Sequence, residues 1–242
     1  MIDLTPTSWR EKFFLGISTK SDHVSLSSTK ITPSPLLAEA QKTFPVPFTS
    51  LMVGEQIHGT HIEQVTSPRP TPLTIFPETD GLITTVPSTA LGIFTADCTA
   101  AMIYDPMTSC LGLAHAGWRG THENILGKLI GLMNSTYRVR SGDCQALLGP
   151  AIGGSCYEIS NDLADKFLAR FPFSQPFFTT APSGKPQMDL RGLQRAQLIN
   201  AGIPEDHITV STDCTHCRGD RYFSYRRDGT LAGRHLTLAV IL

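Results

Sequence analysis

The chain has 242 residues, of which 40% are hydrophobic and 17% charged, so it holds enough apolar material for a full core. Its 20 Lys and Arg residues nearly balance 21 Asp and Glu residues, and the net charge is -1. This balance excludes a global electrostatic attraction to nucleic acid, to a membrane surface or to an acidic polymer.

The N-terminal segment, residues 1–14, carries polar and charged residues where a signal peptide needs an unbroken apolar stretch. Later segments all fall short of the roughly 18 apolar residues of a membrane span. We therefore expect a cytoplasmic protein with no membrane partner, whose six cysteines are thiols because that compartment is reducing.

Short apolar runs bounded by Gly, Pro and Asp predict the β-strands of the fold. The predicted strands are residues 12–18, 47–53, 81–86, 91–94, 100–104, 110–115, 146–148, 207–210 and 235–241. The proline-rich stretch 68–77 is predicted to be a loop.

Apolar residues recur at helical spacing in three segments, which predict helices over about 119–134, from Ser160 to about 171, and over 189–201. Strands interspersed with helices indicate an α/β fold built of mixed α+β layers. Because no repeat or low-complexity linker divides the chain, we expect a single domain over residues 1–242.

Three metal-ligand residue types stand at or near the ends of apolar strands: His58 in "QIHGTH", Cys98 in "TADCTAAMIYDP" and His115 in "LAHAGWRG". Strand ends deliver side chains to one rim of a sheet. Two imidazoles and a thiolate would hold Zn²⁺ and leave a fourth position open, as in a catalytic site. The alternative is that Cys98 is a small buried hydrophobe and that both histidines are hydrogen-bonded strand ends.

Five motifs occur together in the chain: "QIHG" at 56–59, "ADC" at 96–98 with "YDP" at 104–106, "HAGWRG" at 115–120, "GPAIGGSCYEIS" at 149–160 and "FSYRRDGTLAGRHLTLAVI" at 223–241. In order and spacing they resemble the YfiH/laccase-domain family, also called peptidoglycan editing factors and now regarded as purine nucleoside phosphorylases with adenosine deaminase activity. The pairing of "HAGWRG" with "ADC" is the most specific part of the match.

The resemblance implies a single-domain YfiH-like fold and a metal held by His58, Cys98 and His115, with zinc as the expected ion and copper as the alternative. It also implies phosphate and a purine nucleoside as substrates: adenosine, inosine, guanosine or methylthioadenosine. We expect no nucleic-acid partner and a monomer or small homo-oligomer.

Further site residues follow from the matched motifs. Asp97, beside the predicted ligand Cys98, is a candidate proton shuttle or ribose partner; the competing interpretation is a carboxylate that orients a ligand histidine. Arg119 starts a predicted helix, where a guanidinium and unpaired amides could together hold phosphate. A structural salt bridge is the competing interpretation of Arg119.

Gln56 and Arg227 lie within matched motifs and are expected to contact substrate, as is Lys20. Lys20 stands in "STKSDHVS" at 18–25, where family members usually carry Ser-Thr-Arg followed by Gly-Gly-Val-Ser. Lysine keeps the charge of arginine but loses its bidentate fork, so this loop could alter substrate preference.

Two other functions remain open on the sequence. Cys98 could be the nucleophile of a thiol hydrolase or amidase acting on cell-wall precursors, with His115 as its base. The arginine-rich tail, residues 217–235, could form a non-enzymatic module that binds RNA or a phosphate-bearing ligand. Separately, "CTHC" at 214–217 could supply half of a structural zinc site completed by Cys110, Cys144 or Cys156.

Overall fold

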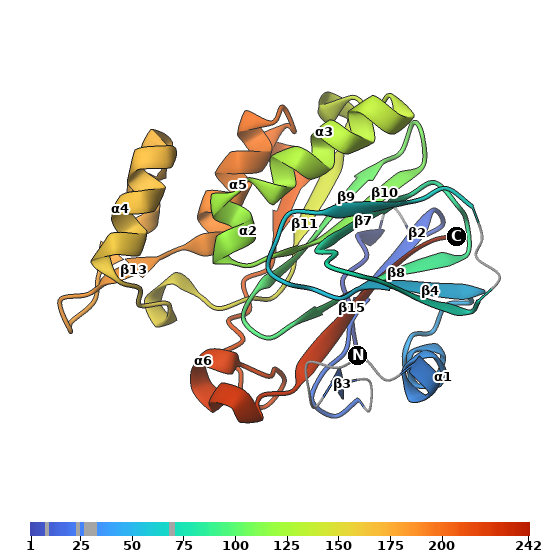
Figure 1. The fold of residues 1–242 in the computed structure, drawn as a ribbon, viewed down its shortest axis with the longest axis horizontal. Coiled ribbons are helices and arrows are strands. Elements are labelled where there is room, and N and C mark those ends of the chain that lie inside the picture. The colour runs from blue at the N-terminus through green and yellow to red at the C-terminus, as the bar shows by residue number, and fades with distance from the viewer. Residues whose placement is uncertain (8–9, 23–24, 27–32, 68–70) are drawn as a thin grey trace.

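Two β-sheets packed face to face form the centre of the molecule in the computed structural model, which describes the chain except residues 8–9, 23–24, 27–32 and 68–70 (Figure 1). The first sheet has the order β1-β2-β15-β8-β4-β6, with β3 also paired to β15. Its strands are β1 (Ile2–Asp3), β2 (Phe13–Ile17), β3 (Ser25–Leu26), β4 (Ser50–Gly54), β6 (Leu73–Phe76), β8 (Thr89–Thr95) and β15 (Arg234–Ile241).

The second sheet has the order β14-β11-β9-β10-β7-β5, and a separate hairpin joins β12 to β13. The strands of the second sheet are β5 (Ile62–Val65), β7 (Gly81–Thr84), β9 (Thr99–Asp105), β10 (Cys110–Ala116), β11 (Gln145–Leu148) and β14 (Ile208–Val210). The hairpin consists of β12 (Phe178–Thr180) and β13 (Pro186–Met188). Both sheets mix parallel and antiparallel pairs.

Helices cover the outer faces of the two sheets, so the layers run helix, sheet, sheet, helix (Figure 1). Helix α1 (Pro33–Thr43) covers the first sheet, whereas α3 (Ile125–Tyr137) and α5 (Leu190–Asn200) cover the second. The remaining α-helices are α2 (Trp118–His122), α4 (Asn161–Arg170) and α6 (Tyr225–Asp228). The predicted α/β fold with mixed layers is confirmed.

Both faces of strand β10 are apolar because each packs against a different part of the core. Leu111 and Leu113 point into the core between the sheets, while Cys110 and Ala114 belong to the core under α3 and α5. Successive side chains of a strand alternate between faces, so a strand buried on both sides needs a continuous apolar run. His115 interrupts this run at the end of β10.

Three predictions about the elements were wrong or incomplete. The single helix predicted over 119–134 is two helices, because Asn124 takes a left-handed conformation (φ 58°) and its side chain caps α3 through Gly127 N. Part of the predicted loop 68–77 is strand β6, which pairs with β4. The predictions also did not include helices α1 and α6 or strands β1, β3, β5, β12 and β13.

The other two helices begin where the sequence predicts. The Ser160 side chain accepts a hydrogen bond from Leu163 N at the start of α4, and that of Asp189 accepts one from Gly192 N at the start of α5. Within the described residues, every helix falls short of the length or apolar character that a membrane span requires.

Candidate metal and active site

The pairing of β9 with β10 brings two of the three predicted ligands together. His115 lies opposite Ala100 and Ala116 opposite Thr99, so the end of β10 adjoins Cys98, the residue before β9 begins. His58 arrives from the other sheet, four residues after β4 ends at Gly54. The donor atoms of His58, Cys98 and His115 all lie within 4.8 Å of one another, and the two imidazole rings meet edge to face with centroids 4.7 Å apart.

A buried carboxylate, Asp80, holds this arrangement in place. Its Oδ1 lies 2.8 Å from His115 Nδ1 and accepts the His58 backbone N–H at 3.0 Å, while its Oδ2 accepts those of Ile57 and Gly59. The pairing with Asp80 leaves His115 Nε2 to face Cys98 or a cation. A carboxylate behind a ligand histidine is the usual means by which proteins fix the tautomer and orientation of that ligand.

Backbone conformation at the site departs from the ordinary regions at two positions. His58 has φ 63° and Asp97 has φ 80°, and such conformations in non-glycine residues cluster where function requires them. The hydrogen bonds that the backbone N–H groups of residues 57–59 donate to Asp80 hold His58 in this conformation. Gly117 is required for a different reason: a Cβ there would lie 2.7 Å from Cys98 Sγ.

The charges of the metal-free site favour an ion pair. Burial opposes ionisation of the Cys98 thiol, but the facing His115 and His58 lower its pKa to about 6. Burial likewise opposes protonation of His115, yet the thiolate of Cys98 and the carboxylate of Asp80 raise its pKa to about 9. A thiolate and two imidazoles form a donor set that fits zinc, since Zn²⁺ accepts nitrogen and sulfur ligands with one position left open.

The three side chains open into a cavity of about 580 Å³, within the range of small-molecule sites. Its apolar lining includes Ile152 and the aromatic rings of Trp118, Tyr157 and Tyr225. The cavity therefore offers flat apolar surface beside the ligand cluster.

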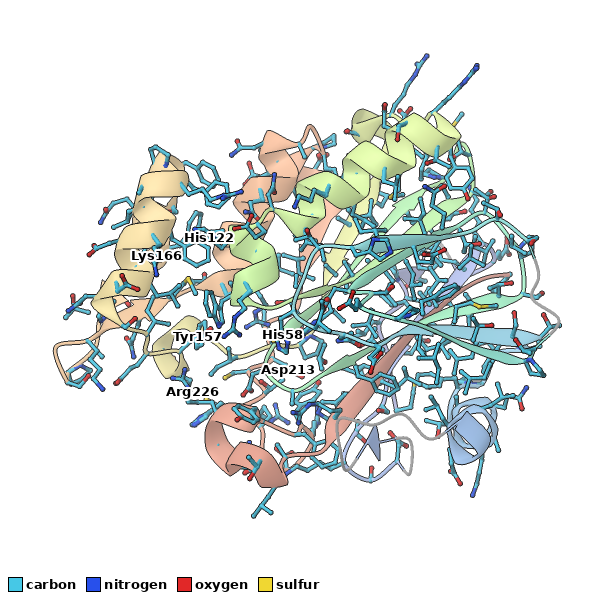
Figure 2. All side chains as sticks on the ribbon, in the orientation of Figure 1. His58, His122, Tyr157, Lys166, Asp213 and Arg226 are labelled. Carbon is cyan, nitrogen blue, oxygen red and sulfur yellow. The ribbon has the colours of Figure 1, made fainter. Side chains whose placement is uncertain are left out.

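Three arginines, Arg119, Arg226 and Arg234, line the same cavity. The Arg119 guanidinium lies over the Trp118 ring, 4.3 Å from its centroid. Arg226 lies over the Tyr157 ring, 5.1 Å from its centroid, and Figure 2 labels both of these residues. Backbone carbonyls hold the Arg226 and Arg234 guanidinium groups. Glu55 and Asp97 also line the cavity. Since none of the three arginines is paired with a carboxylate among the described residues, their guanidinium groups are available to an anion.

Asp97 lines the cavity, but other residues use its carboxylate. Oδ1 accepts a hydrogen bond from Thr215 Oγ1 at 2.6 Å, and Oδ2 accepts hydrogen bonds from Ser224 Oγ and the backbone N–H of Arg226. It thus joins the turn before Cys98 to the segment around α6. The carboxylate that pairs with a histidine is Asp80 rather than Asp97.

The expected substrate contacts divide into two groups. Gln56 and Arg119 line the cavity, although the Gln56 amide is engaged by both backbone groups of Phe94. Lys20 and Arg227 lie outside the lining: Lys20 Nζ donates to Gly219 O at 3.0 Å, and Arg227 is paired with Asp228 and three carbonyls. His23 and Val24 of the "STKSDHVS" loop lie outside the described residues.

Sequence reasoning missed Asp80 and Tyr157 as site residues, and it considered Arg226 and Arg234 only as part of the arginine-rich tail. The signal for Asp80 was its place in "ETDG", a polar turn directly before the buried strand β7, at the same kind of position as the predicted ligands. Arg226 and Arg234 stand in the motif that directed attention to Arg227.

Comparison with known proteins identifies the family of this chain. The sequence profile of the family described as multi-copper polyphenol oxidoreductase laccase matches residues 36–242. Purine nucleoside phosphorylase YlmD of Geobacillus stearothermophilus is 37% identical over 189 residues, 75% of this chain and 69% of that protein. A protein of an unknown prokaryotic organism named adenosine deaminase RL5 is 32% identical over 163 residues, 65% of this chain and 60% of the relative.

Among solved structures, the Bacillus licheniformis hypothetical protein YfiH superposes with a TM-score of 0.86 and 28% identity, covering 97% of this chain and 94% of its own. The sequence match and the shared fold agree with the motifs that resemble the YfiH/laccase-domain family. The chain therefore belongs to the laccase-like YfiH/YlmD family.

Proposed function

We propose that this chain is a zinc-dependent purine nucleoside phosphorylase that also deaminates adenosine. The observation that carries the proposal is the convergence of His58, Cys98 and His115 in a cavity whose arginines lack carboxylate partners among the described residues. The names of the relatives support the reaction class. Expected substrates are phosphate with adenosine, inosine, guanosine or methylthioadenosine.

In this proposal the ligand cluster serves the chemistry of the base. His58, Cys98 and His115 would hold the zinc ion, with copper as the alternative metal. When bound, zinc would act as a Lewis acid and lower the pKa of a bound water molecule towards about 7. Asp80 keeps His115 in the tautomer whose Nε2 is free to bind the metal. In deamination, water oxygen bonds to C6 of adenosine and the exocyclic amino group leaves as ammonia.

The arginines would serve phosphate. Arg119, Arg226 and Arg234 can bind its oxygens and position one of them for attack on the ribose C1′. The C1′–N9 bond then breaks, the base nitrogen takes the electron pair and a proton, and ribose 1-phosphate forms. Asp97 is a positioning residue here, because its carboxylate fixes the turn at Cys98 and the backbone of Arg226.

The direct test incubates the purified protein with adenosine, inosine and phosphate, with and without zinc after treatment with a chelator, and separates the products by chromatography. We expect phosphate-dependent release of hypoxanthine from inosine, inosine from adenosine, and loss of both reactions with the chelator. Cys98→Ser should lose one equivalent of zinc together with activity, since serine is a poor zinc ligand. The matched control, Cys144→Ser, alters a buried cysteine outside the cavity lining and should keep the metal.

One observation favours a second function, the thiol hydrolase. The metal-free pair of Cys98 and His115 has the charges of an activated cysteine nucleophile, a thiolate beside an imidazolium. Full zinc occupancy in Cys98→Ser with no turnover, or amide hydrolysis that survives the chelator, would favour this function over the phosphorylase.

The binding-module alternative has less support from the tail. Arg218 and Arg221 pair with aspartates, Arg227 is bound internally, and Tyr222 is fully buried. Salt-dependent RNA binding at physiological ionic strength would support the binding-module function.

We further propose a cytoplasmic location, because a reducing compartment keeps the Cys98 thiolate available.

A further inference from the structure

A second cluster of soft ligands lies outside the cavity. Cys156, His216 and Cys217 place their donor atoms within 4.8 Å of one another. Cys156 and Cys217 are 61 residues apart in sequence, yet their sulfurs are 3.3 Å apart. Of the four residues of "CTHC", His216 and Cys217 both belong to this cluster, and Cys156 is the partner that the fold selects from the three candidate cysteines.

The two loops that carry this cluster are held together by the chain itself. Ala151 and Cys214 form a β-bridge, and Thr215 N donates to Ala151 O at 3.1 Å. Cys214 Sγ accepts the Gly153 backbone N–H at 3.1 Å. The donor atoms are therefore brought together by protein contacts alone.

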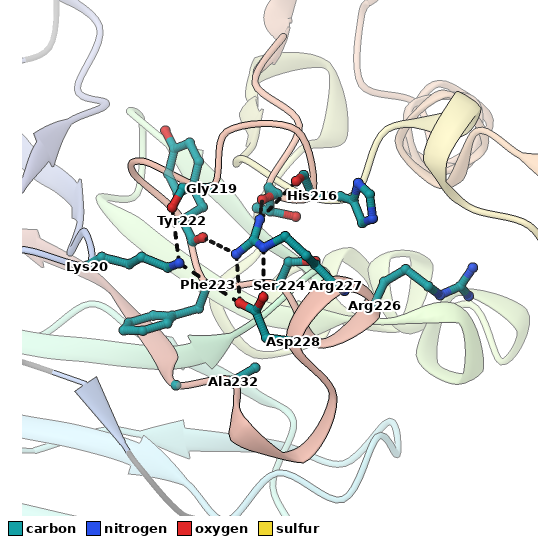
Figure 3. Close-up of polar contacts among 12 residues, drawn as sticks. Lys20, His216, Gly219, Tyr222, Phe223, Ser224, Arg226, Arg227, Asp228 and Ala232 are labelled. Carbon is teal, nitrogen blue, oxygen red and sulfur yellow. Dashed lines mark hydrogen bonds and ion pairs between the residues drawn. The ribbon is translucent and has the colours of Figure 1, made fainter.

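Arg227 fixes the backbone of the cluster from the other side. Its Nη1 donates to Thr215 O at 3.0 Å and to His216 O at 2.9 Å, while its Nη2 is paired with Asp228 (Figure 3). A buried or half-buried guanidinium spread over several carbonyls is a rigid support. Arg227, which lies outside the cavity lining, therefore supports the backbone of this cluster.

The spacing and the chemistry of the donors suit one ion. Two thiolates on a tetrahedral zinc ion, each bonded at about 2.3 Å, stand about 3.7 Å apart. The observed sulfur separation is 3.3 Å, so the two sulfurs need to separate only slightly to bind one ion. Thiolate and imidazole are the ligands that zinc and copper(I) prefer over harder donors. Cys217 is exposed, which leaves room for water at a fourth position.

We propose that Cys156, His216 and Cys217 form a second metal site, for zinc or another soft ion, that joins the loop after β11 to the loop after β14. Binding one divalent ion releases the two thiol protons to solvent and leaves the site neutral. The loop of Cys156 also carries Ile152 and Tyr157 of the cavity lining, and Thr215 binds Asp97. The second ion would thus stabilise loops that contribute to the cavity lining and contact the turn at Asp97.

The test counts metal. The full chain is stripped with a chelator under anaerobic, reducing conditions and titrated with zinc alone, and with cobalt(II) to record thiolate-to-metal absorption. We expect two equivalents in the wild type, one in Cys98→Ser, one in Cys217→Ser and one in Cys156→Ser. His216→Ala should lower the affinity for the second zinc ion at least about tenfold. The double variant Cys98→Ser/Cys217→Ser should bind none.

His61→Ala is the matched control, because His61 is an exposed histidine whose side chain pairs with Glu63 and belongs to neither cluster. It should keep both equivalents. Melting temperatures of the metal-free variants, compared with the metal-free wild type, verify that each is folded.

The proposal is overturned if Cys217→Ser and His216→Ala bind as many equivalents as the wild type, with unchanged affinity. It is also overturned if the reduced protein takes no second ion and mass spectrometry shows that Cys156 and Cys217 form a disulfide on exposure to air. Each result concerns the second ion alone, since the proposed catalytic ion is followed through Cys98→Ser and turnover.

Discussion

The two sides of the cavity are built on opposite plans. On the ligand side, Asp80 is fully buried and binds His115 and three backbone amides, so every polar group that supports the cluster is paired. On the arginine side, the guanidinium groups of Arg226 and Arg234 are held by carbonyls, and carboxylate partners are lacking within the described residues.

The difference separates two tasks. Paired anionic and neutral donors in a rigid setting suit a cation that remains bound, whereas guanidinium groups that lack carboxylate partners among the described residues suit an anion that must enter and leave. Substitutions on the ligand side should therefore change metal affinity and stability together. Those on the arginine side should change the affinity for phosphate and leave the metal in place.

Asp80→Ala should have the largest effect. It leaves buried N–H groups of the His58 loop without an acceptor and His115 without its partner, so we expect a loss of about 3–5 kcal/mol in the free energy of unfolding and at least about 10–100-fold in zinc affinity at the first site. Urea unfolding and zinc competition measure the two losses.

The control for Asp80→Ala is Asp105→Ala. Asp105 is also buried, but it supports the turn between β9 and β10 through Met107 N and Thr108 Oγ1. Its removal should destabilise the protein and leave zinc affinity unchanged. Equal zinc affinity in both variants would refute the role given to Asp80.

Gly117→Ala tests the close packing of the same side. The new methyl group would lie 2.7 Å from Cys98 Sγ, so the thiolate or the backbone must move. We expect destabilisation of about 1–3 kcal/mol with weaker zinc binding. Gly131→Ala is the control, because nothing lies within 4 Å of the Cβ that the substitution would add, and alanine favours a helix. Zinc affinity unchanged in Gly117→Ala would contradict the predicted crowding.

The ligand side could be predicted in large part from the sequence, and the arginine side could not. His58, Cys98 and His115 stand at or near ends of strands with clear apolar runs, and strand ends meet at a rim regardless of exact topology. Asp80 occupies the same kind of position, but one carboxylate in a turn has no periodic signal, and turns contain aspartate for many reasons.

The arginine side depends on local backbone conformation in short elements such as α6. Arg226 and Arg227 are adjacent in sequence, yet one lines the cavity and the other packs against carbonyls of residues 215, 216 and 222. Only the start of α6 at Tyr225 decides which way each points. The break at Asn124 has the same origin, since a left-handed residue inside an apolar helical pattern leaves the spacing of that pattern unchanged.

Arg119→Lys sharpens the comparison from the arginine side. Lysine keeps the charge but loses the fork and the planar contact with Trp118. Loss of one charge-assisted hydrogen bond should raise the KM for phosphate about tenfold, without a change in zinc content or in deamination, which uses no phosphate.

The matched control for Arg119→Lys is Arg227→Lys, which should lower the melting temperature because four partners lose a guanidinium, with the KM for phosphate unchanged. If Arg119→Lys lowers phosphorolysis and deamination by the same factor, Arg119 is structural.

The smallest effect concerns the charge of the metal-free ligand side. The lowered pKa of Cys98 stabilises the fold above the ordinary thiol pKa of 9.0, and this stability is lost as pH falls through about 6. The raised pKa of His115 stabilises it below 6.5, and this stability is lost as pH rises through about 9. Between these limits the two changes oppose each other, so unfolding experiments would hardly register the pair.

Alkylation detects the ionisation of Cys98 directly, because only the thiolate reacts. In the metal-free protein the rate at which iodoacetamide modifies Cys98, followed by peptide mass spectrometry, should rise with an inflection near pH 6 and be suppressed by zinc. Cys217 is an internal control, since hydrogen bonding with Cys156 and Cys214 raises its pKa to about 12 and its rate should climb only in alkaline solution. His115→Gln removes the cation that faces the thiolate, so its Cys98 inflection should move towards pH 9. A wild-type inflection already near 9 would show that the thiol is neutral, and that only the metal draws its proton away.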